Sequence, residues 1–185
     1  MRGMDRQGTD ATVDADADER RPPALVFVYT WDIVRAILAI FAALGSFSGT
    51  RRQNGRDVGV PVGVQVLEAL AAGALAIALF LIGTLLTRRA AWVRRAQVIV
   101  LVMAIILNGV TVTVAMVTDE TARDLATGLV SGLLVLVDIL VVFVMTSPRM
   151  KRWFSEPGVV PIYLGGLVAF WAAASGAFFV LGLRS

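Results

Sequence analysis

Four ionisable residues lie inside long apolar stretches of the chain, and they are the residues whose types could do chemistry. Asp32 and Arg35 lie in the first stretch, Glu68 in the second and Asp138 in the fourth. A charged side chain at the centre of a bilayer costs several kcal/mol unless it is paired or hydrated, so each of the four needs a partner or a function. Carboxylates and a guanidinium in this setting predict either a buried ion-pair network or a proton or cation relay.

The spacing of these residues predicts which of them meet. Arg35 lies about ten residues, or roughly 15 Å, from the start of its stretch, and Asp138 lies roughly 10 to 14 Å from the end of its own. With the N-terminus inside, the two are at similar depth and can pair. Asp32 precedes Arg35 by one helical turn, so Arg35 is expected to bridge both carboxylates. Glu68 is expected near the outer end of its helix, and Asn108, at mid-span, in an interhelical hydrogen bond.

Several kinds of catalytic site are missing from the sequence. The chain has no cysteine and no histidine, which excludes disulfides, thiolate nucleophiles, imidazole catalysis and the usual zinc sites. It also lacks a phosphate-binding loop, a dinucleotide fingerprint and a nucleophile elbow. Two carboxylates can share a proton in an aspartyl site, but Arg35 would hold both ionised. We therefore predict no catalytic residue, no cofactor, no metal site and no enzymatic activity.

Five apolar stretches must position the ionisable residues. They cover about residues 24–47, 62–87, 98–117, 125–145 and 162–183. Each approaches or exceeds the roughly 20 residues that a helix needs to cross about 30 Å of hydrocarbon. With 57% hydrophobic and 17% charged residues, the chain is also too apolar for a soluble domain. This predicts an all-α, polytopic transmembrane helical bundle of about five spans. The alternative is four spans plus an interfacial helix, because the first stretch contains two charges.

The charges outside these stretches predict domain organisation and orientation. Residues 1–23 hold six acidic and four basic residues before Pro22-Pro23, which is typical of a disordered tail, and residues 24–185 form the bundle. With the N-terminus inside, the inner segments carry eleven Arg and Lys residues and the outer segments five. This bias favours a cytoplasmic N-terminus and an outside C-terminus in a bacterial plasma membrane. Arg51, Arg52 and Arg56, in the first outer loop, run against it.

Two inner connections combine basic and aromatic residues, and these are expected to contact anionic lipid headgroups. The residues are Arg88, Arg89, Trp92, Arg94, Arg95, Arg149, Lys151, Arg152 and Trp153. Met150, Trp153 and Phe154 follow helical spacing, which predicts a short helix with its apolar face in the headgroup boundary. Of the 17 basic residues 16 are arginines, yet they lie between apolar spans, so we expect lipid rather than nucleic acid as their partner.

The last apolar stretch carries small residues at every fourth position, which we call the small-residue stripe. It consists of Gly165, Ala169, Ala173 and Ala177. Such a stripe lets another helix pack closely, and we expect that helix to belong to the same chain rather than to a second copy. Trp171 is expected between helices.

Two further segments carry a resemblance to a known group of proteins. The run LLTRRAAWVRRA, residues 85–96, and the run FVMTSPRMKRWF, residues 143–154, are similar to segments of small uncharacterised four-helix integral membrane proteins of high-GC Gram-positive bacteria. The resemblance covers about residues 23–154. It implies an architecture and no known activity, so it assigns no site residue. Those proteins usually end after the fourth helix, whereas this chain continues through residues 155–185.

Together these features predict an integral membrane protein that serves as a structural or accessory subunit of a membrane assembly. Its partners would be lipid and either another membrane protein or a second copy. One alternative is a small transporter or channel component that uses Asp32, Arg35, Asp138 and Glu68. Another is a membrane enzyme acting on lipid-linked substrates, which would need polar groups clustered at one interface.

Overall fold

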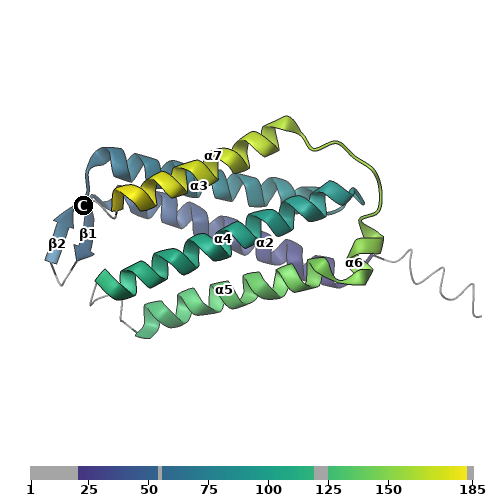
Figure 1. The fold of residues 1–185 in the computed structure, drawn as a ribbon, viewed down its shortest axis with the longest axis horizontal. Helices are drawn as coiled ribbons and strands as arrows, with labels where there is room; N and C mark the ends of the chain where they lie inside the picture. The colour runs from purple at the N-terminus through teal and green to yellow at the C-terminus, as the bar shows by residue number, and fades with distance from the viewer. Residues whose placement is uncertain (1–20, 54–55, 119–124, 183–185) are drawn as a thin grey trace, which may run out of the picture.

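The computed structural model describes residues 21–53, 56–118 and 125–182, so most of the predicted tail lies outside the described residues. The described chain forms a bundle of five long helices, with a two-stranded hairpin at one end and a short helix at the other (Figure 1). The long helices are α2 (Ala24–Gly45), α3 (Val62–Leu85), α4 (Ala91–Thr118), α5 (Leu125–Thr146) and α7 (Ile162–Gly182). The prediction of an all-α helical bundle is therefore confirmed.

Four of these helices, α2 to α5, are long and apolar enough to cross a membrane. The apolar part of α7 is shorter, Ile162–Phe178, so the described chain has four such helices and a fifth shorter one. Most predicted stretches agree with the helix bounds to within about two residues. The third was wrong at its start, because α4 begins at Ala91 rather than at Val98. Arginines are good helix formers, and nothing between Ala91 and Val98 breaks the helix.

The helices pack in two groups. In the first group α3 lies between α2 and α7, and in the second α4 packs along α5; the contacts between the two groups are fewer. Buried apolar side chains such as Leu79, Ile82 and Leu101 fill the interior. Large apolar side chains also cover the outside: Phe143, for example, is 75% exposed. A surface this apolar is stable against lipid and not against water.

The two ends of the bundle differ. At one end η1 (Ser46–Ser48) leads into strands β1 (Thr50–Gln53) and β2 (Arg56–Gly59), which pair antiparallel with Thr50 opposite Gly59. Gly49 has a φ of 75°, a left-handed conformation that glycine adopts without strain, and this turns the chain into the hairpin. At the other end lies α6 (Pro148–Trp153), where the side chain of Ser147 caps the first turn. The chain enters α2 at the α6 end and leaves α7 at the hairpin end (Figure 1).

Candidate functional site

Five polar or aromatic side chains from three helices meet in the interior, and we call them the polar cluster. They are Trp31, Asp32 and Arg35 of α2, Gln97 of α4 and Asp138 of α5. Asp32, Gln97 and Asp138 are 0% exposed, and Arg35 is 8% exposed. Groups buried to this degree must satisfy one another, because lipid and the apolar core offer no hydrogen bonds.

Asp138 is the most fully paired member of the polar cluster. Nη2 of Arg35 lies 3.0 Å from Oδ2 of Asp138, so the ion pair that the depth argument predicted is formed. Nε1 of Trp31 donates a hydrogen bond of 2.8 Å to the other oxygen, Oδ1. Trp31 and Arg35 are four residues apart and therefore share the face of α2 that looks toward α5. A carboxylate with a guanidinium and an indole N–H around it is stabilised in its charged form.

Asp32 makes a different contact. Nε2 of Gln97 donates a hydrogen bond of 2.5 Å to Oδ1 of Asp32, and Asp32 forms no ion pair with Arg35. The prediction that Arg35 bridges both carboxylates was therefore wrong. The reason is the helical rotation of about 100° per residue: Asp32 follows Trp31 and so points toward α4 instead of α5. The two carboxylates therefore have partners on different helices: Asp32 is bonded from α4, and Asp138 is bonded from α2.

Three polar atoms in the cluster have no hydrogen-bond partner within the part of the chain that the structure describes. They are Oδ2 of Asp32, Oε1 of Gln97 and Nε of Arg35, while a fourth, Oδ2 of Asp138, also lacks a hydrogen bond but has Arg35 as its ion-pair partner. Helix α3 closes the cluster from the side, because a Cβ placed on Gly83 would lie 3.5 Å from Cβ and 3.7 Å from Oδ2 of Asp32. A Cβ there would only be in van der Waals contact with Asp32, so α3 leaves little open space beside this carboxyl. Buried polar atoms without a partner are uncommon, and each needs an explanation.

The sequence did not predict two members of the polar cluster, Gln97 and Trp31. Gln97 falls in the predicted connection before the third span, together with the four arginines at positions 88, 89, 94 and 95. An unbroken helical run from Ala91 was the signal that could have placed Gln97 on a helix face. Trp31 was counted with the apolar residues, although a buried indole N–H usually needs an acceptor and Asp32 stands beside it in sequence.

Glu68 and Asn108, two other residues predicted for the network, lie outside it. Glu68 is half-buried on α3, 15 residues before Gly83 and so about 22 Å nearer the hairpin end. Gln65, one turn earlier, donates a hydrogen bond of 2.6 Å to the carbonyl of Val60 and fixes the start of α3. Asn108 is half-buried on α4, 11 residues beyond Gln97. The structure therefore brings together three of the five predicted residues.

The predicted headgroup residues gather at the α6 end. Arg88, Arg95, Arg149, Lys151 and Arg152 are exposed there, while Arg89, Arg94 and Trp153 are half-buried. The guanidinium of Arg89 lies 4.2 Å from the centre of the Trp153 ring, a cation–π contact. The backbone of Glu156 pairs with the start of α4, accepting from the amide of Ala91 at 3.0 Å and donating to the carbonyl of Arg89 at 3.1 Å. These contacts tie α6 to the turn between α3 and α4.

Three apolar side chains at this end point into the protein. Met150 and Phe154 are each 1% exposed and Trp92 is 8% exposed. The prediction that these side chains insert into the headgroup boundary was therefore wrong. Helix α6 folds back onto the bundle, because the backbone pairing at Glu156 holds the following segment against α4. Its apolar face covers the end of the core and leaves the basic side chains outside.

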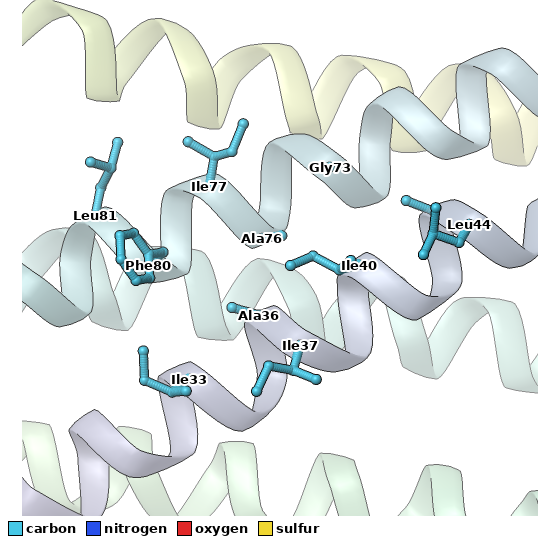
Figure 2. Close-up of a pocket in the computed structure, with 11 residues that line it drawn as sticks. Ile33, Ala36, Ile37, Ile40, Leu44, Gly73, Ala76, Ile77, Phe80 and Leu81 are labelled. Atoms are coloured by element: carbon cyan, nitrogen blue, oxygen red, sulfur yellow. The ribbon is translucent and has the colours of Figure 1, made fainter.

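A groove on the described surface lies between α2 and α3, with a volume of about 570 Å³. Ile37 and Ile40 from α2 and Ile77 and Phe80 from α3 are among its lining residues (Figure 2). Every lining side chain is apolar, so the groove offers no hydrogen bond that would orient a polar ligand. It is separate from the carboxylates of the polar cluster.

The small-residue stripe also differs from its prediction. Gly165, Ala169, Ala173 and Ala177 are all exposed, so no helix of the described chain packs on them. Helix α7 instead turns Leu164, Trp171 and Ala174 inward, and Trp171 is 3% exposed between helices as expected.

The fold and the polar cluster define a helical bundle with a buried polar centre, whose long apolar helices are compatible with a multi-pass membrane protein. Among the described residues no group of three or more His, Cys, Asp or Glu side chains could hold a metal ion. Comparisons of the chain with known protein families, with curated proteins and with solved structures found no match. The resemblance to small four-helix membrane proteins stays a prediction, and the function must be argued from the geometry.

Proposed function

We propose that the protein is a structural or accessory component of a membrane assembly, and that the polar cluster fixes how its helices are arranged. The observation that carries the proposal is the position of the cluster between the two helix groups. Asp138 on α5 pairs with Arg35 and Trp31 on α2, and Gln97 on α4 pairs with Asp32 on α2. All three contacts join the α2–α3–α7 group to the α4–α5 group, which otherwise share few contacts.

The energetics support this role. Apolar side chains in lipid gain little by facing each other, so apolar packing alone specifies helix position weakly. A buried ion pair satisfies its charges in one arrangement and leaves them unpaired in any other, where the penalty is several kcal/mol. The Arg35–Asp138 contact therefore excludes alternative registers of α2 against α5 more than it stabilises the native one.

We further propose a cytoplasmic N-terminus, an outside C-terminus and a bacterial plasma membrane as the location. The arginine bias of the sequence supports this orientation, and the basic residues of the α3–α4 turn and of α6 share one end of the bundle. That end would face the cytoplasm and the anionic headgroups. The partner in the assembly would be another membrane protein or a second copy of the chain.

A flux measurement tests the structural role. The purified protein, reconstituted alone in liposomes, should conduct neither protons nor small solutes above the level of empty liposomes. Saturable flux that Asp138→Asn or Arg35→Ala abolishes would sink the proposal. An Asn108→Ala variant is the matched control and should leave the flux unchanged, because Asn108 is a half-buried polar residue of α4 that lies outside the polar cluster.

The second candidate is a small transporter or channel component. The unpartnered oxygens of Asp32 and Gln97 favour it, since groups that bind and release a cation or a proton need free lone pairs. Its weak point is access, because three cluster members are 0% exposed and α3 leaves no more than about the space of a methyl group beside Asp32. For this candidate, conservative neutralisation of Asp32 should remove flux and leave protein levels unchanged.

A further inference from the structure

The polar cluster holds more negative than positive charge. Asp32 and Asp138 contribute two carboxylates and Arg35 contributes one guanidinium. Arg94 lies one turn before Gln97 on α4, but it forms no ion pair within the part of the chain that the structure describes. With both acids ionised, the sealed centre would therefore carry one uncompensated negative charge. A buried charge of this kind is usually neutralised by a proton or a bound cation.

The hydrogen bonds identify which carboxyl group holds the additional charge. Asp138 forms an ion pair with Arg35 and accepts a hydrogen bond from Trp31, and both interactions favour its ionised form. Asp32 receives a single neutral donor, the amide of Gln97, and its second oxygen has no partner. Oε1 of the same Gln97 amide also has no hydrogen-bond partner, whereas the third such oxygen, Oδ2 of Asp138, has Arg35 as its ion-pair partner. The two orphaned oxygens, Oδ2 of Asp32 and Oε1 of Gln97, thus belong to two side chains that already touch.

We propose that Asp32 and Gln97 together bind one proton inside the bundle. The proton comes from solvent and is bonded to Oδ2 of Asp32, whose O–H then donates to Oε1 of Gln97. The amide still donates to Oδ1, so carboxylic acid and amide form a closed pair with two hydrogen bonds. One proton satisfies both orphaned oxygens and removes the excess charge. A metal cation fits less well, because hard cations take about six oxygen ligands and this site offers two.

The surroundings of Asp32 are consistent with a held proton. On α2 the neighbouring groups are Trp31, which is engaged with Asp138, and Tyr29, whose ring lies beside Gly83. On α3 the neighbour is Gly83 itself, which brings backbone and no titratable group. On α4 it is Gln97, and on α5 it is Asp138 with its arginine. No described base other than the Asp138 carboxylate faces the site. The inference goes beyond the proposed function, since it assigns a ligand whether or not the protein transports.

Infrared spectroscopy of the full chain in lipid vesicles tests the proposal. Aspartates labelled with ¹³C at the side-chain carboxyl would shift the C=O stretch of a protonated aspartic acid away from unlabelled signals. We expect one such band in the native protein at neutral pH and its complete loss in Asp32→Asn. Asp57→Asn is the matched control, because Asp57 lies in β2 outside the cluster, and it should leave the band unchanged. Gln97→Leu should keep the band but move it to higher frequency, as a hydrogen bond to the acid is lost.

Thermal unfolding of the same samples separates a proton from a metal ion. Asn at position 32 is neutral and can pair with the Gln97 amide, so Asp32→Asn should change the melting temperature by less than about 4 °C. Exchange of sodium chloride for choline chloride should change nothing. Absence of the labelled band in the native protein overturns the proposal, whatever the variants do. So does a band that survives Asp32→Asn, or a stabilisation by sodium that Asp32→Asn removes. The liposome flux assay fails or succeeds independently of all three.

Discussion

At the scale of single residues, the Arg35–Asp138 contact shows how an apolar helical bundle can use two buried charges, each of which would be costly without its partner. Replacing a buried ion pair by apolar groups is often neutral for stability, whereas removing one partner leaves an unpaired charge. The contact therefore adds little to the free energy of unfolding, but any arrangement that separates Arg35 from Asp138 carries a large penalty. The hydrogen bond from Trp31 strengthens this, because it gives the second oxygen of Asp138 a partner on the same helix face.

A double-mutant cycle measures this behaviour. Arg35→Ala should lower the free energy of unfolding by about 3–5 kcal/mol, because it leaves the Asp138 carboxylate buried and unpaired. Adding Asp138→Asn should restore part of that loss, since the remaining group is neutral and keeps the Trp31 hydrogen bond. Unfolding of the purified protein in detergent, together with its level in the membrane, provides the readout. If the double variant loses as much stability as the two single variants lose together, Arg35 and Asp138 do not act as a pair.

The residue scale is also where prediction from sequence was least complete. Asp32, Arg35 and Asp138 could be singled out because a charge in an apolar stretch stands out by type alone. Their pairing could not be fully predicted, because spacing along a helix gives depth but not which neighbour each face meets. Asp32 is bonded to Gln97. Gln97 could not be predicted as its partner, because the predicted third span begins at Val98 and α4 begins at Ala91.

At the scale of elements, the bounds of the long helices follow from the physics of the bilayer, while the ends of the bundle do not. A stretch of about 20 apolar residues is helical because lipid satisfies no backbone group. Segments outside the lipid face no such constraint. The pairing of β1 with β2 and of Glu156 with the start of α4 depends on contacts between segments that sequence periodicity does not encode.

Gly158 tests the closure of the α6 end. A Cβ at this position would lie 3.0 Å from Cδ1 and Nε1 of Trp92 and 3.2 Å from Cβ of Ala90, so the indole would have to shift. We expect Gly158→Ala to destabilise the protein by about 1–3 kcal/mol through overpacking. Gly165→Ala is the control: nothing lies within 4 Å of its Cβ, and alanine should stabilise α7 by about 0.5–1 kcal/mol. Thermal unfolding should thus move in opposite directions for the two variants. Equal shifts would mean that the segment after α6 does not rest on Trp92.

At the scale of the whole molecule, two helix groups joined through a few side chains make a bundle whose long helices expose many large apolar side chains. The outward small-residue stripe belongs to this scale, because its prediction failed on topology: α7 lies against α3, and its inward face is set by Leu164 and Trp171. Composition could predict an apolar helix at α7, but not which of its faces would be covered. The pairing of Arg35 with Asp138, by contrast, was predictable, because each residue's distance from the end of its own apolar stretch can be counted along the sequence.

The alternation of the helices predicts a topology that reporter fusions can measure. Fusions after residues 23, 88 and 155 should report the cytoplasm, and fusions after residues 55, 121 and 185 the outside, because the α6 end carries the exposed basic residues and each long helix reverses the chain. The informative position is 185, because the apolar part of α7 is shorter than those of the other helices. A cytoplasmic report there, with the other five unchanged, would leave α2 to α5 crossing and the polar cluster intact. A report from the cytoplasm after residue 55 has a different consequence: α2 would not cross, Arg35 would lose the depth at which it meets Asp138, and the register role proposed for the cluster would have to be abandoned.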